Sequence, residues 1–182
     1  IYSVNVHTGA KRLIGRSYRT APKWSVNGKW AVMYDPIAQV WNKFDGATGK
    51  VVNISDAIGY PMFMESYDKP APAPAYGIAG WTADGNNVFL YDAYDWWKTD
   101  LTGERQPECL TKGYGRKHGK SIRKMTSNID KDVFQKDEKV IVSLWDKDTM
   151  DEGVYQLDMK GRLRKLMEGN YAVSYTHLTL PT

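Results

Sequence analysis

A two-part sequence repeat constrains the fold of this chain more than any other feature, because sequences that recur at a fixed interval build arrays of one structural unit. The first unit is an aromatic residue, a short polar turn and an apolar strand that ends in an aromatic residue and Asp. Its copies are residues 24–35 (WSVNGKWAVMYD), residues 81–92 (WTADGNNVFLYD) and the weaker residues 134–146 (FQKDEKVIVSLWD).

The second unit follows each copy of the first. It is a strand, then Asp or Asn, then a turn that ends in Gly and leads into another strand. Its copies are residues 45–49, 100–103 and 158–161, and a further copy at residues 5–9 has no first unit before it. Because the two units occur together, they form one module.

Each unit is typical of a β-hairpin. Asn27-Gly28 and Asp84-Gly85 favour tight primed turns, since both tolerate a positive φ. The flanking segments are short, β-branched or aromatic and nearly continuously apolar, as expected for strands covered on both faces. Two hairpins per module give four strands, which is the pattern of a propeller blade. The sequence therefore predicts an all-β fold: a partial β-propeller of about three four-stranded antiparallel blades plus a half blade.

The module boundaries divide the chain. Residues 22–55, 79–111 and 132–168 are three expected blades, and residues 1–15 are a partial one. Propellers close with about four to eight blades, so the simplest account of residues 1–173 is a propeller segment that continues on both sides in the natural protein. Residues 174–182 (SYTHLTLPT) fit no part of the repeat and resemble a translated adapter, which indicates a non-native tail.

Two long segments connect the expected blades. Residues 57–80 contain Pro61, Pro70, Pro72 and Pro74 and should be extended and stiff. They are either a docking segment for an aromatic groove or a long loop that crosses one end of the propeller. Residues 112–131 are rich in Lys and Arg. They are either a nucleic-acid site or a solvated connector, and the single aromatic residue in the segment, Tyr114, favours the connector.

Composition excludes several classes of protein. The net charge of +4 does not demand nucleic acid as a partner. A single cysteine, Cys109, excludes an internal disulfide framework and any multi-cysteine metal site. No apolar run reaches the roughly 18 residues that a membrane-spanning helix needs.

Catalytic motifs are incomplete. Gly119-Lys120-Ser121 supplies the end of a phosphate-binding loop, but the glycine needed at position 114 is Tyr114. Ser17 and Ser121 each follow a Gly-x pair but lack the second glycine of a nucleophile elbow. The histidines that a Ser-His-Asp triad would need are scattered, at His7, His118 and His177. We therefore predict no catalytic, cofactor-binding or metal-binding residue in this chain.

Two further candidate sites have weaker support in the sequence. Asp146, Asp148 and Asp151 offer oxygen ligands to Ca²⁺, although Leu157 stands where an EF-hand would place its bidentate acid, and a solvated loop is favoured. Trp96-Trp97 is the best candidate for a sugar-binding surface. That hypothesis predicts that both rings are solvent-exposed, and it fails if both are buried. The tryptophans at repeat positions are expected in the core between blades: Trp24, Trp81 and Trp145.

The residues resemble a known family. The run at 24–29 (WSVNGK) is similar to the Trp-Ser-Pro-Asp-Gly-Lys signature of propellers in the prolyl oligopeptidase family and in TolB-like repeats. More specific are residues 74–85 (PAYGIAGWTADG), 91–103 (YDAYDWWKTDLTG) and 110–117 (LTKGYGRK), which resemble the N-terminal propeller of large Bacteroidetes members of that family. The resemblance covers residues 1–173. It departs from the pattern in the missing proline of the signature and in the degenerate third copy.

The resemblance implies a serine peptidase that cleaves short peptides, with a propeller that gates substrate access to a C-terminal α/β-hydrolase domain. The family's Ser, Asp and His lie in that domain, so no catalytic role is assigned to a residue of this chain. It also implies export to the periplasm or secretion. One alternative is a binding or scaffold propeller of the TolB-like kind without enzymatic activity, and a carbohydrate-binding propeller is a third.

Overall fold

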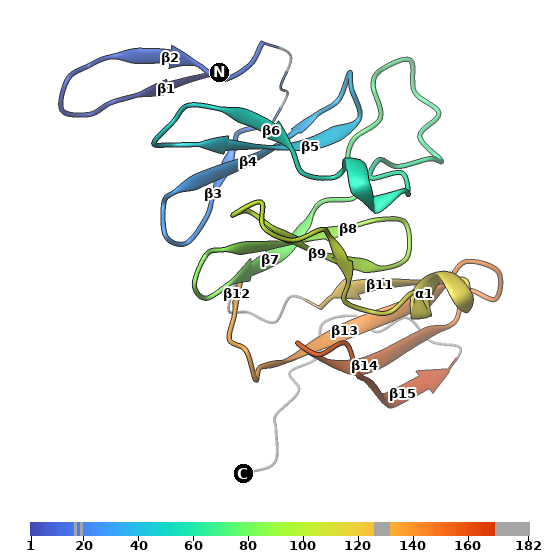
Figure 1. The fold of residues 1–182 in the computed structure, drawn as a ribbon. Helices are drawn as coiled ribbons and strands as arrows, with labels where there is room; N and C mark the ends of the chain where they lie inside the picture. Colours follow the sequence, from blue (N-terminus) through green and yellow to red (C-terminus); the bar gives the residue numbers. More distant parts are fainter. Residues whose placement is uncertain (17, 19, 126–131, 170–182) are drawn as a thin grey trace.

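The computed structural model describes residues 1–16, 18, 20–125 and 132–169 of the 182-residue chain. The described part is an all-β fold, as the repeat predicts, with four sheets that follow one another down the molecule in chain order (Figure 1). None of these sheets closes on itself. Within the described ranges the helical structure comprises one 3-10 turn and one short α-helix.

The N-terminal part forms a hairpin and a first sheet. The hairpin pairs β1 (Tyr2–Val4) with β2 (Lys11–Leu13). The first sheet is antiparallel and places its strands in chain order: β3 (Lys23–Trp24), β4 (Trp30–Asp35), β5 (Val40–Asp45) and β6 (Val51–Asn53).

The middle sheet contains five strands. Four are antiparallel and in chain order: β7 (Ile78–Thr82), β8 (Asn87–Tyr91), β9 (Trp96–Asp100) and β10 (Glu108–Cys109). The fifth, β12 (Val133–Phe134), runs parallel to β7. Helix α1 (Tyr114–Lys117) follows β10.

The third sheet is again four-stranded and antiparallel. Its strand order is β11 (Lys120–Lys124), β13 (Lys139–Asp146), β14 (Glu152–Asp158) and β15 (Leu163–Gly169).

The start of the third sheet corrects the predicted module. The expected blade at residues 132–168 began with the Phe134 hairpin, whereas β12 pairs with β7 of the middle sheet and β11 supplies the first strand of the third sheet. The predicted connector at residues 112–131 therefore contains both a helix and a strand. The weak third copy of the first unit explains why β12 does not form a hairpin with β13. It lacks the Asn-Gly or Asp-Gly turn of the other two, and its Phe134 ring packs on Phe89 and Trp96 of the middle sheet.

The Asp or Asn of five repeat turns has the same structural role. In these five turns one side-chain oxygen accepts hydrogen bonds from the backbone N–H groups two and three residues ahead, which is the geometry of an Asx-turn. This holds for Asn5, Asp35, Asp45, Asp92 and Asp146. Asp100 and Asp158 instead accept from N–H groups two and four residues ahead. The repeat therefore conserves turn chemistry within the chain as well as strand pattern.

The two glycine turns confirm the predicted hairpins but not the predicted primed turn type, because such a turn needs a positive φ at both central residues and Asn27 and Asp84 do not have one. Gly28 and Gly85 both have a φ of +69°. The two turns also touch, because the Asn27 side-chain amide donates to the backbone oxygen of Asp84 at 2.8 Å. Their surroundings differ: a Cβ on Gly85 would lie 2.7 Å from the Asn27 side chain, whereas a Cβ on Gly28 would meet nothing within 4 Å.

We expect Gly28→Ala to lower the free energy of unfolding by about 1 kcal/mol, the cost of a left-handed backbone for a residue with a Cβ. Gly85→Ala should cost at least about 1 kcal/mol more, because the new methyl group also overlaps Asn27. Urea denaturation of the two variants measures the difference. Equal losses would mean that the two turns do not touch.

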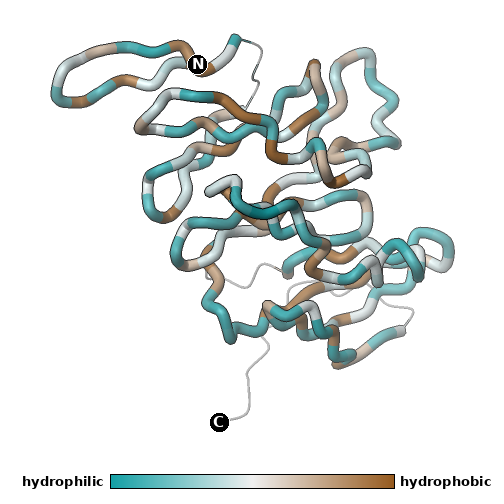
Figure 2. The backbone as a smooth tube through the Cα atoms, in the orientation of Figure 1, coloured by the Kyte–Doolittle hydropathy of each residue, from teal (hydrophilic) through white to brown (hydrophobic). Residues whose placement is uncertain are grey.

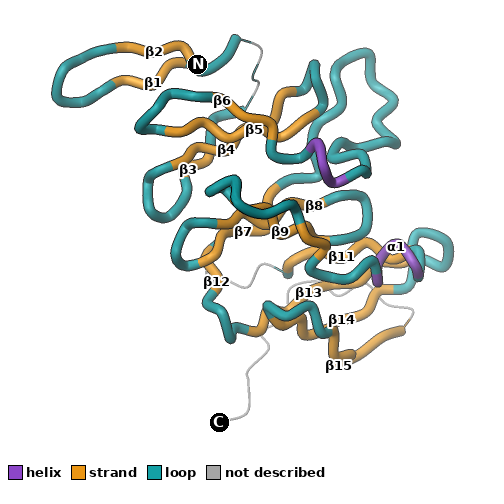
Figure 3. Tube along the Cα trace, viewed as in Figure 1, coloured by secondary structure: helices purple, strands orange, loops and turns teal. Residues whose placement is uncertain are grey.

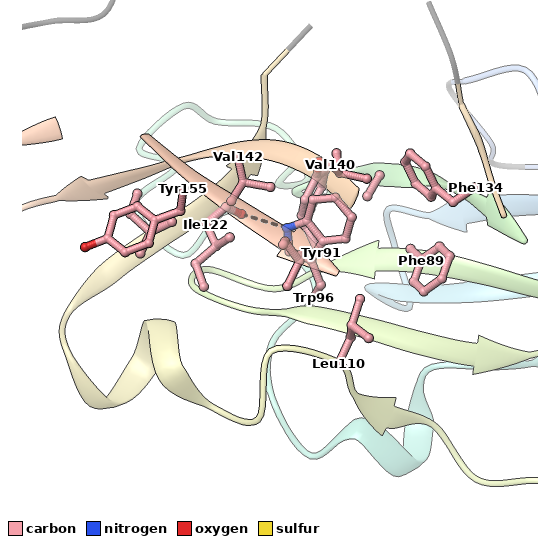
Figure 4. Close-up of a cluster of buried hydrophobic side chains, with 12 residues drawn as sticks. Phe89, Tyr91, Trp96, Leu110, Ile122, Phe134, Val140, Val142 and Tyr155 are labelled. Atoms are coloured by element: carbon pink, nitrogen blue, oxygen red, sulfur yellow. Dashed lines mark hydrogen bonds between the residues drawn. The ribbon is translucent and has the colours of Figure 1, made fainter. Parts of the chain in front are cut away.

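The middle sheet is buried on both faces because successive residues of a strand point to opposite sides. On β8, Val88 and Leu90 pack in one core cluster with Val32, Tyr34 and Trp41 of the first sheet. The alternate residues Phe89 and Tyr91 pack in the other cluster, with residues of the third sheet (Figure 4). Figure 2 shows apolar colour along the strands and polar colour in most of the turns between them.

The outer sheets differ from the expected core. Trp81 is buried at 5% exposure, as predicted, but Trp24 is 49% exposed and Trp145 is 40% exposed. Trp24 is on the face of the first sheet that the two-stranded N-terminal hairpin covers only in part. Trp145 pairs with Glu152, on the opposite face of the third sheet from the Val142–Tyr155 pair in the core. The prediction for these two rings was wrong.

The segment at residues 57–80 is a long loop that packs on the chain's own sheets. It begins at the 3-10 turn η1 (Asp56–Ile58) and places Ile58 and Met62 in the core between the first and middle sheets. Its proline-rich part contacts the first sheet, where the Tyr34 hydroxyl donates to the backbone oxygen of Ala73 at 3.2 Å. The turn η1 and helix α1 lie on the same side of the molecule (Figure 3).

Candidate functional site

Two buried carboxylates lie where β8 turns into β9, and this is the most polar buried region of the described chain. Asp92 is 0% exposed and Asp95 is 1% exposed. Buried acids are rare unless they are paired or fully hydrogen-bonded, and paired acids also serve as catalytic groups. Their hydrogen-bond partners decide between these two roles.

Asp92 has every acceptor position in use. Its Oδ1 accepts from the backbone N–H groups of Tyr94 and Asp95, at 2.7 and 2.6 Å. Its Oδ2 accepts from the indole Nε1 of Trp97 at 3.0 Å and from the guanidinium of Arg116 at 2.9 Å. One carboxylate thus fixes its own turn, a side chain of β9 and helix α1.

Asp95 binds the same helix from the other side of the turn. Its Oδ1 accepts from the Thr111 hydroxyl at 2.6 Å and from the backbone N–H of Gly115 at 2.9 Å. Its Oδ2 accepts from the backbone N–H of Arg116 at 3.0 Å. A Cβ on Gly115 would come within 2.7 Å of the backbone oxygen of Tyr94, so the close approach of α1 to this turn requires glycine.

Arg123 on β11 joins this turn to the third sheet. Its guanidinium donates to the backbone oxygens of Asp92 at 2.8 Å and Ala93 at 3.1 Å. The charge also lies over two aromatic rings, with distances to the ring centroids of 4.7 Å for Tyr91 and 5.4 Å for Tyr76. Burial lowers the pKa of Arg123, and the carbonyl dipoles and ring faces offset that cost.

An open cavity of about 380 Å³ lies beside these groups. The rings of Tyr60 and Trp97 form one wall, with their centroids 5.9 Å apart. The Arg116 guanidinium lies over the Tyr60 ring, 3.8 Å from its centroid. Cys109 lies in the wall and accepts from the N–H of Gly113 at 3.2 Å. Burial raises the pKa of the Cys109 thiol, so it is protonated at neutral pH and a poor nucleophile.

These contacts form a network with a structural role. The hydroxyl of Ser121 donates to the backbone oxygen of Ala93 at 2.6 Å and faces no base. His118 packs on Tyr114 with ring centroids 4.4 Å apart, and His7 is in an exposed turn. Ser17 and His177 lie outside the described residues. Asp92, Asp95, Arg116 and Arg123 together fasten the β8–β9 turn to α1 and to the third sheet.

The acidic loop and the tryptophan pair singled out in the sequence lie outside this network or only partly within it. Asp146 uses its Oδ1 to accept from the N–H groups of Asp148 and Thr149, and within the described ranges no group of three or more His, Cys, Asp or Glu is arranged to hold a metal ion. Trp96 is fully buried and the Trp97 N–H is bound to Asp92, but the Trp97 ring is only partly buried and lines the open cavity. The prediction that both rings are exposed is therefore wrong for Trp96, and the sugar-binding hypothesis for the pair stays a prediction.

The basic segment has charges that bind partners within the chain. Arg116 pairs with Asp92, Lys120 with Glu168, and Lys124 with Asp132. The described part of the segment is therefore more than a solvated connector, because helix α1 and strand β11 use Arg116, Lys120 and Lys124, whereas Lys112 and Lys117 are exposed. Residues 126–131 lie outside the described residues.

Glu168 provides a test of these ion pairs. Its hydrogen bonds from Lys120 and Lys165 lower its pKa from 4.5 to about 2. A carboxyl whose pKa is depressed by folding stabilises the native state above its unfolded pKa and loses that effect as the pH falls. Both Glu168 and Lys120 are partly exposed, so we expect Glu168→Gln to cost about 1 kcal/mol at pH 7.

The difference between Glu168→Gln and the parent chain should shrink as the pH falls from 4.5 towards 2. Denaturant unfolding across this range measures it. A difference that does not change with pH would show that the charge of Glu168 plays no part.

Sequence reasoning missed Asp95, Arg123 and the role of α1. A signal for Asp95 exists, because the first module has Ala38 where the second has Asp95, three residues after the turn acid. No comparable signal marks Arg123, which is one of several cations in the segment.

Among the described residues, no helix is long and apolar enough to cross a membrane. No known protein-family model matches the sequence, and no curated protein is significantly similar to it.

Proposed function

We propose that the chain is a non-catalytic β-propeller segment that gates substrate access to the α/β-hydrolase domain of a serine peptidase and scaffolds that domain. The observation that carries this proposal is the stack of three sheets, each with four antiparallel strands, whose middle member is buried on both faces by its neighbours. Blades of a propeller pack on one another in this way, with edges and faces covered by the next repeat.

The polar network supports the same role. The sequence runs on which the family resemblance rests include the network residues Asp92, Asp95, Trp97 and Arg116. Their side chains hold the β8–β9 turn to β9 and to helix α1, and Arg123 of β11 joins the same turn to the third sheet. A gate of this kind must keep its shape while peptides pass, and a buried, satisfied polar network favours one fixed arrangement of blades.

The alternative is a binding scaffold with no hydrolase domain. The open cavity beside Tyr60 and Arg116 favours it, because concave sites with aromatic walls and a few charged groups are typical of ligand pockets. The two proposals differ in what the complete protein contains.

Sequencing the natural reading frame beyond residue 173 tests the proposal. We expect a Gly-x-Ser-x-Gly segment between a strand and a helix, followed along the chain by Asp and then His. The product of that frame should be labelled by a fluorophosphonate, which reacts with activated serines, and replacing the serine of that segment should abolish the label. A frame that closes after further repeats, with no labelling, would leave the binding scaffold as the function.

A further inference from the structure

The open cavity beside Tyr60 has a lining that combines flat rings with hydrogen-bond donors. The loop after η1 supplies Tyr60, strand β9 supplies Trp97, and helix α1 supplies Arg116 and Lys117. At about 380 Å³ the cavity is near the lower end of the range for small-molecule pockets, roughly 300–1,000 Å³. It therefore has room for a small ligand with one or two rings.

The walls of this cavity are two aromatic rings and a thiol. The Tyr60 and Trp97 ring planes are inclined at 43° to one another, and both rings are accessible, since Tyr60 is 44% exposed and Trp97 is partly buried. Burial raises the pKa of the Cys109 thiol, so this part of the wall carries no charge at neutral pH. A ligand that contacts these walls needs an apolar face.

Arg116 lines the same cavity and has hydrogen-bond donors to spare. Its Nη2 donates to Asp92, and the other N–H groups of the guanidinium have no acceptor among the described residues. The side chain is 32% exposed, so a ligand can reach it. The ion pair with Asp92 and the rings of Tyr60 and Tyr94, at 3.8 and 5.0 Å, hold the guanidinium in place before any ligand arrives.

The charges of the lining favour an anion. Two cations, Arg116 and the exposed Lys117, stand against one acid, Asp95. Both oxygens of Asp95 are already engaged, by the Thr111 hydroxyl and by two backbone N–H groups of α1. The lining therefore offers more free donors than free acceptors. A sugar would bring several hydroxyl groups that each need an acceptor, whereas a carboxylate brings acceptors alone.

We propose that this cavity binds a small aromatic carboxylate. The ring of the ligand packs against Tyr60 and Trp97, and its carboxylate accepts from the N–H groups of Arg116 that Asp92 leaves unused, with the Lys117 ammonium close by. Guanidinium groups suit carboxylates because the bonds are charge-assisted and the donors are fixed in one plane. The site lies wholly within this chain, so its failure would leave the proposed gating function standing.

The test is a titration of the isotope-labelled 182-residue chain with indole-3-acetate, followed by the indole N–H signals of the protein in NMR. The Trp97 signal, assigned by its loss in Trp97→Phe, should shift in a saturable manner. Indole-3-acetamide has the same rings without the charge and should bind at least about tenfold more weakly. Acetate, which has the charge without the rings, should not shift the signal, and neither should glucuronate, a sugar with a carboxylate.

Lys117→Gln and Lys112→Gln are a matched pair, because both lysines are exposed in one segment and Lys117 is the one that lines the cavity. Lys117→Gln should weaken the binding of indole-3-acetate roughly two- to fivefold, and Lys112→Gln should leave it unchanged. Tyr60→Leu removes half of the aromatic wall and should weaken binding roughly three- to tenfold. Arg116→Lys keeps a charge beside Asp92 without the planar donors and should weaken binding about tenfold, with the other indole signals unmoved.

Three results would overturn the proposal: an unmoved Trp97 signal, equal binding of indole-3-acetamide and indole-3-acetate, or equal losses in Lys117→Gln and Lys112→Gln. A saturable shift with glucuronate and none with indole-3-acetate would also overturn it, and would identify an acidic sugar as the ligand.

Discussion

Asp92→Ala is expected to lower the free energy of unfolding by about 3–5 kcal/mol, a large part of the stability of an ordinary domain. The substitution removes the acceptor of the Arg116 guanidinium, the Trp97 indole and two backbone N–H groups in one step. Each of these donors is then left without an acceptor, which destabilises the folded state. The Arg116 guanidinium also loses its only ion pair among the described residues. Thermal and urea unfolding, followed by circular dichroism, measure the loss.

Asp35→Ala is the matched control for this effect. Asp35 has the same repeat position and the same Asx-turn, in which its Oδ1 accepts from the N–H groups of Ile37 and Ala38. It contacts no other element through that side chain within the described ranges. Its loss should cost about 1 kcal/mol, as for other capping residues. Equal effects at Asp35 and Asp92 would show that the contacts to Trp97 and Arg116 add nothing.

Asp92→Asn separates charge from hydrogen bonding. The amide oxygen can still accept from the turn, but the ion pair with Arg116 is lost. We expect a loss between those of the two alanine variants, because the turn survives and the guanidinium is left without its counter-charge.

The fold was largely predictable from turn chemistry. Gly28 and Gly85 adopt the positive φ that their dipeptides favour, and the turn acids Asp35, Asp92 and Asp146 all form the same local hydrogen bonds. These interactions are set by residues adjacent in sequence. They fix hairpins wherever they occur, so a repeat of the turn residues predicts a repeat of the hairpins.

The pairing of hairpins into sheets was less predictable. Strand β12 was expected beside β13, but Phe134 packs on Phe89 and Trp96, and its strand joins the middle sheet. Strand β11 instead pairs with β13 at the edge of the third sheet, where Ile122 is fully buried. Which sheet an aromatic residue enters depends on contacts far apart in sequence, and a local pattern of apolar and polar residues carries little information about them.

The polar network was the least predictable part of the site. Arg123 is one cation in a basic run, and nothing local distinguishes it from an exposed lysine. Its role follows from the position of its guanidinium over Tyr91 and beside the backbone oxygen of Asp92, residues about thirty positions earlier. Burial of a charge is decided by the tertiary fold, since the charge must meet carbonyls and ring faces that the fold brings together.

Trp96→Ala should have an effect of similar size, a loss of about 3–5 kcal/mol, because it empties the centre of the core between the middle and third sheets. Trp96 is fully buried, packs on Tyr91 and Phe134, and donates from its indole Nε1 to the backbone oxygen of Ile122 at 3.1 Å (Figure 4). The substitution leaves a cavity and removes a hydrogen bond that crosses between two sheets. Urea unfolding gives the magnitude.

Trp24→Ala is the control for side-chain size, since Trp24 is half exposed on the first sheet and should cost about 1 kcal/mol or less. Trp96→Phe separates the contribution of apolar packing from that of the hydrogen bond, because it keeps an aromatic ring and removes the bond to the backbone oxygen of Ile122. If the sheets hold together chiefly through apolar contact, Trp96→Phe should retain most of the stability lost in Trp96→Ala. If the bond between sheets dominates, the two variants should be nearly equal. A Trp96→Ala effect as small as that of Trp24→Ala would contradict a core shared by the middle and third sheets and, with it, the stack of sheets on which the proposed function depends.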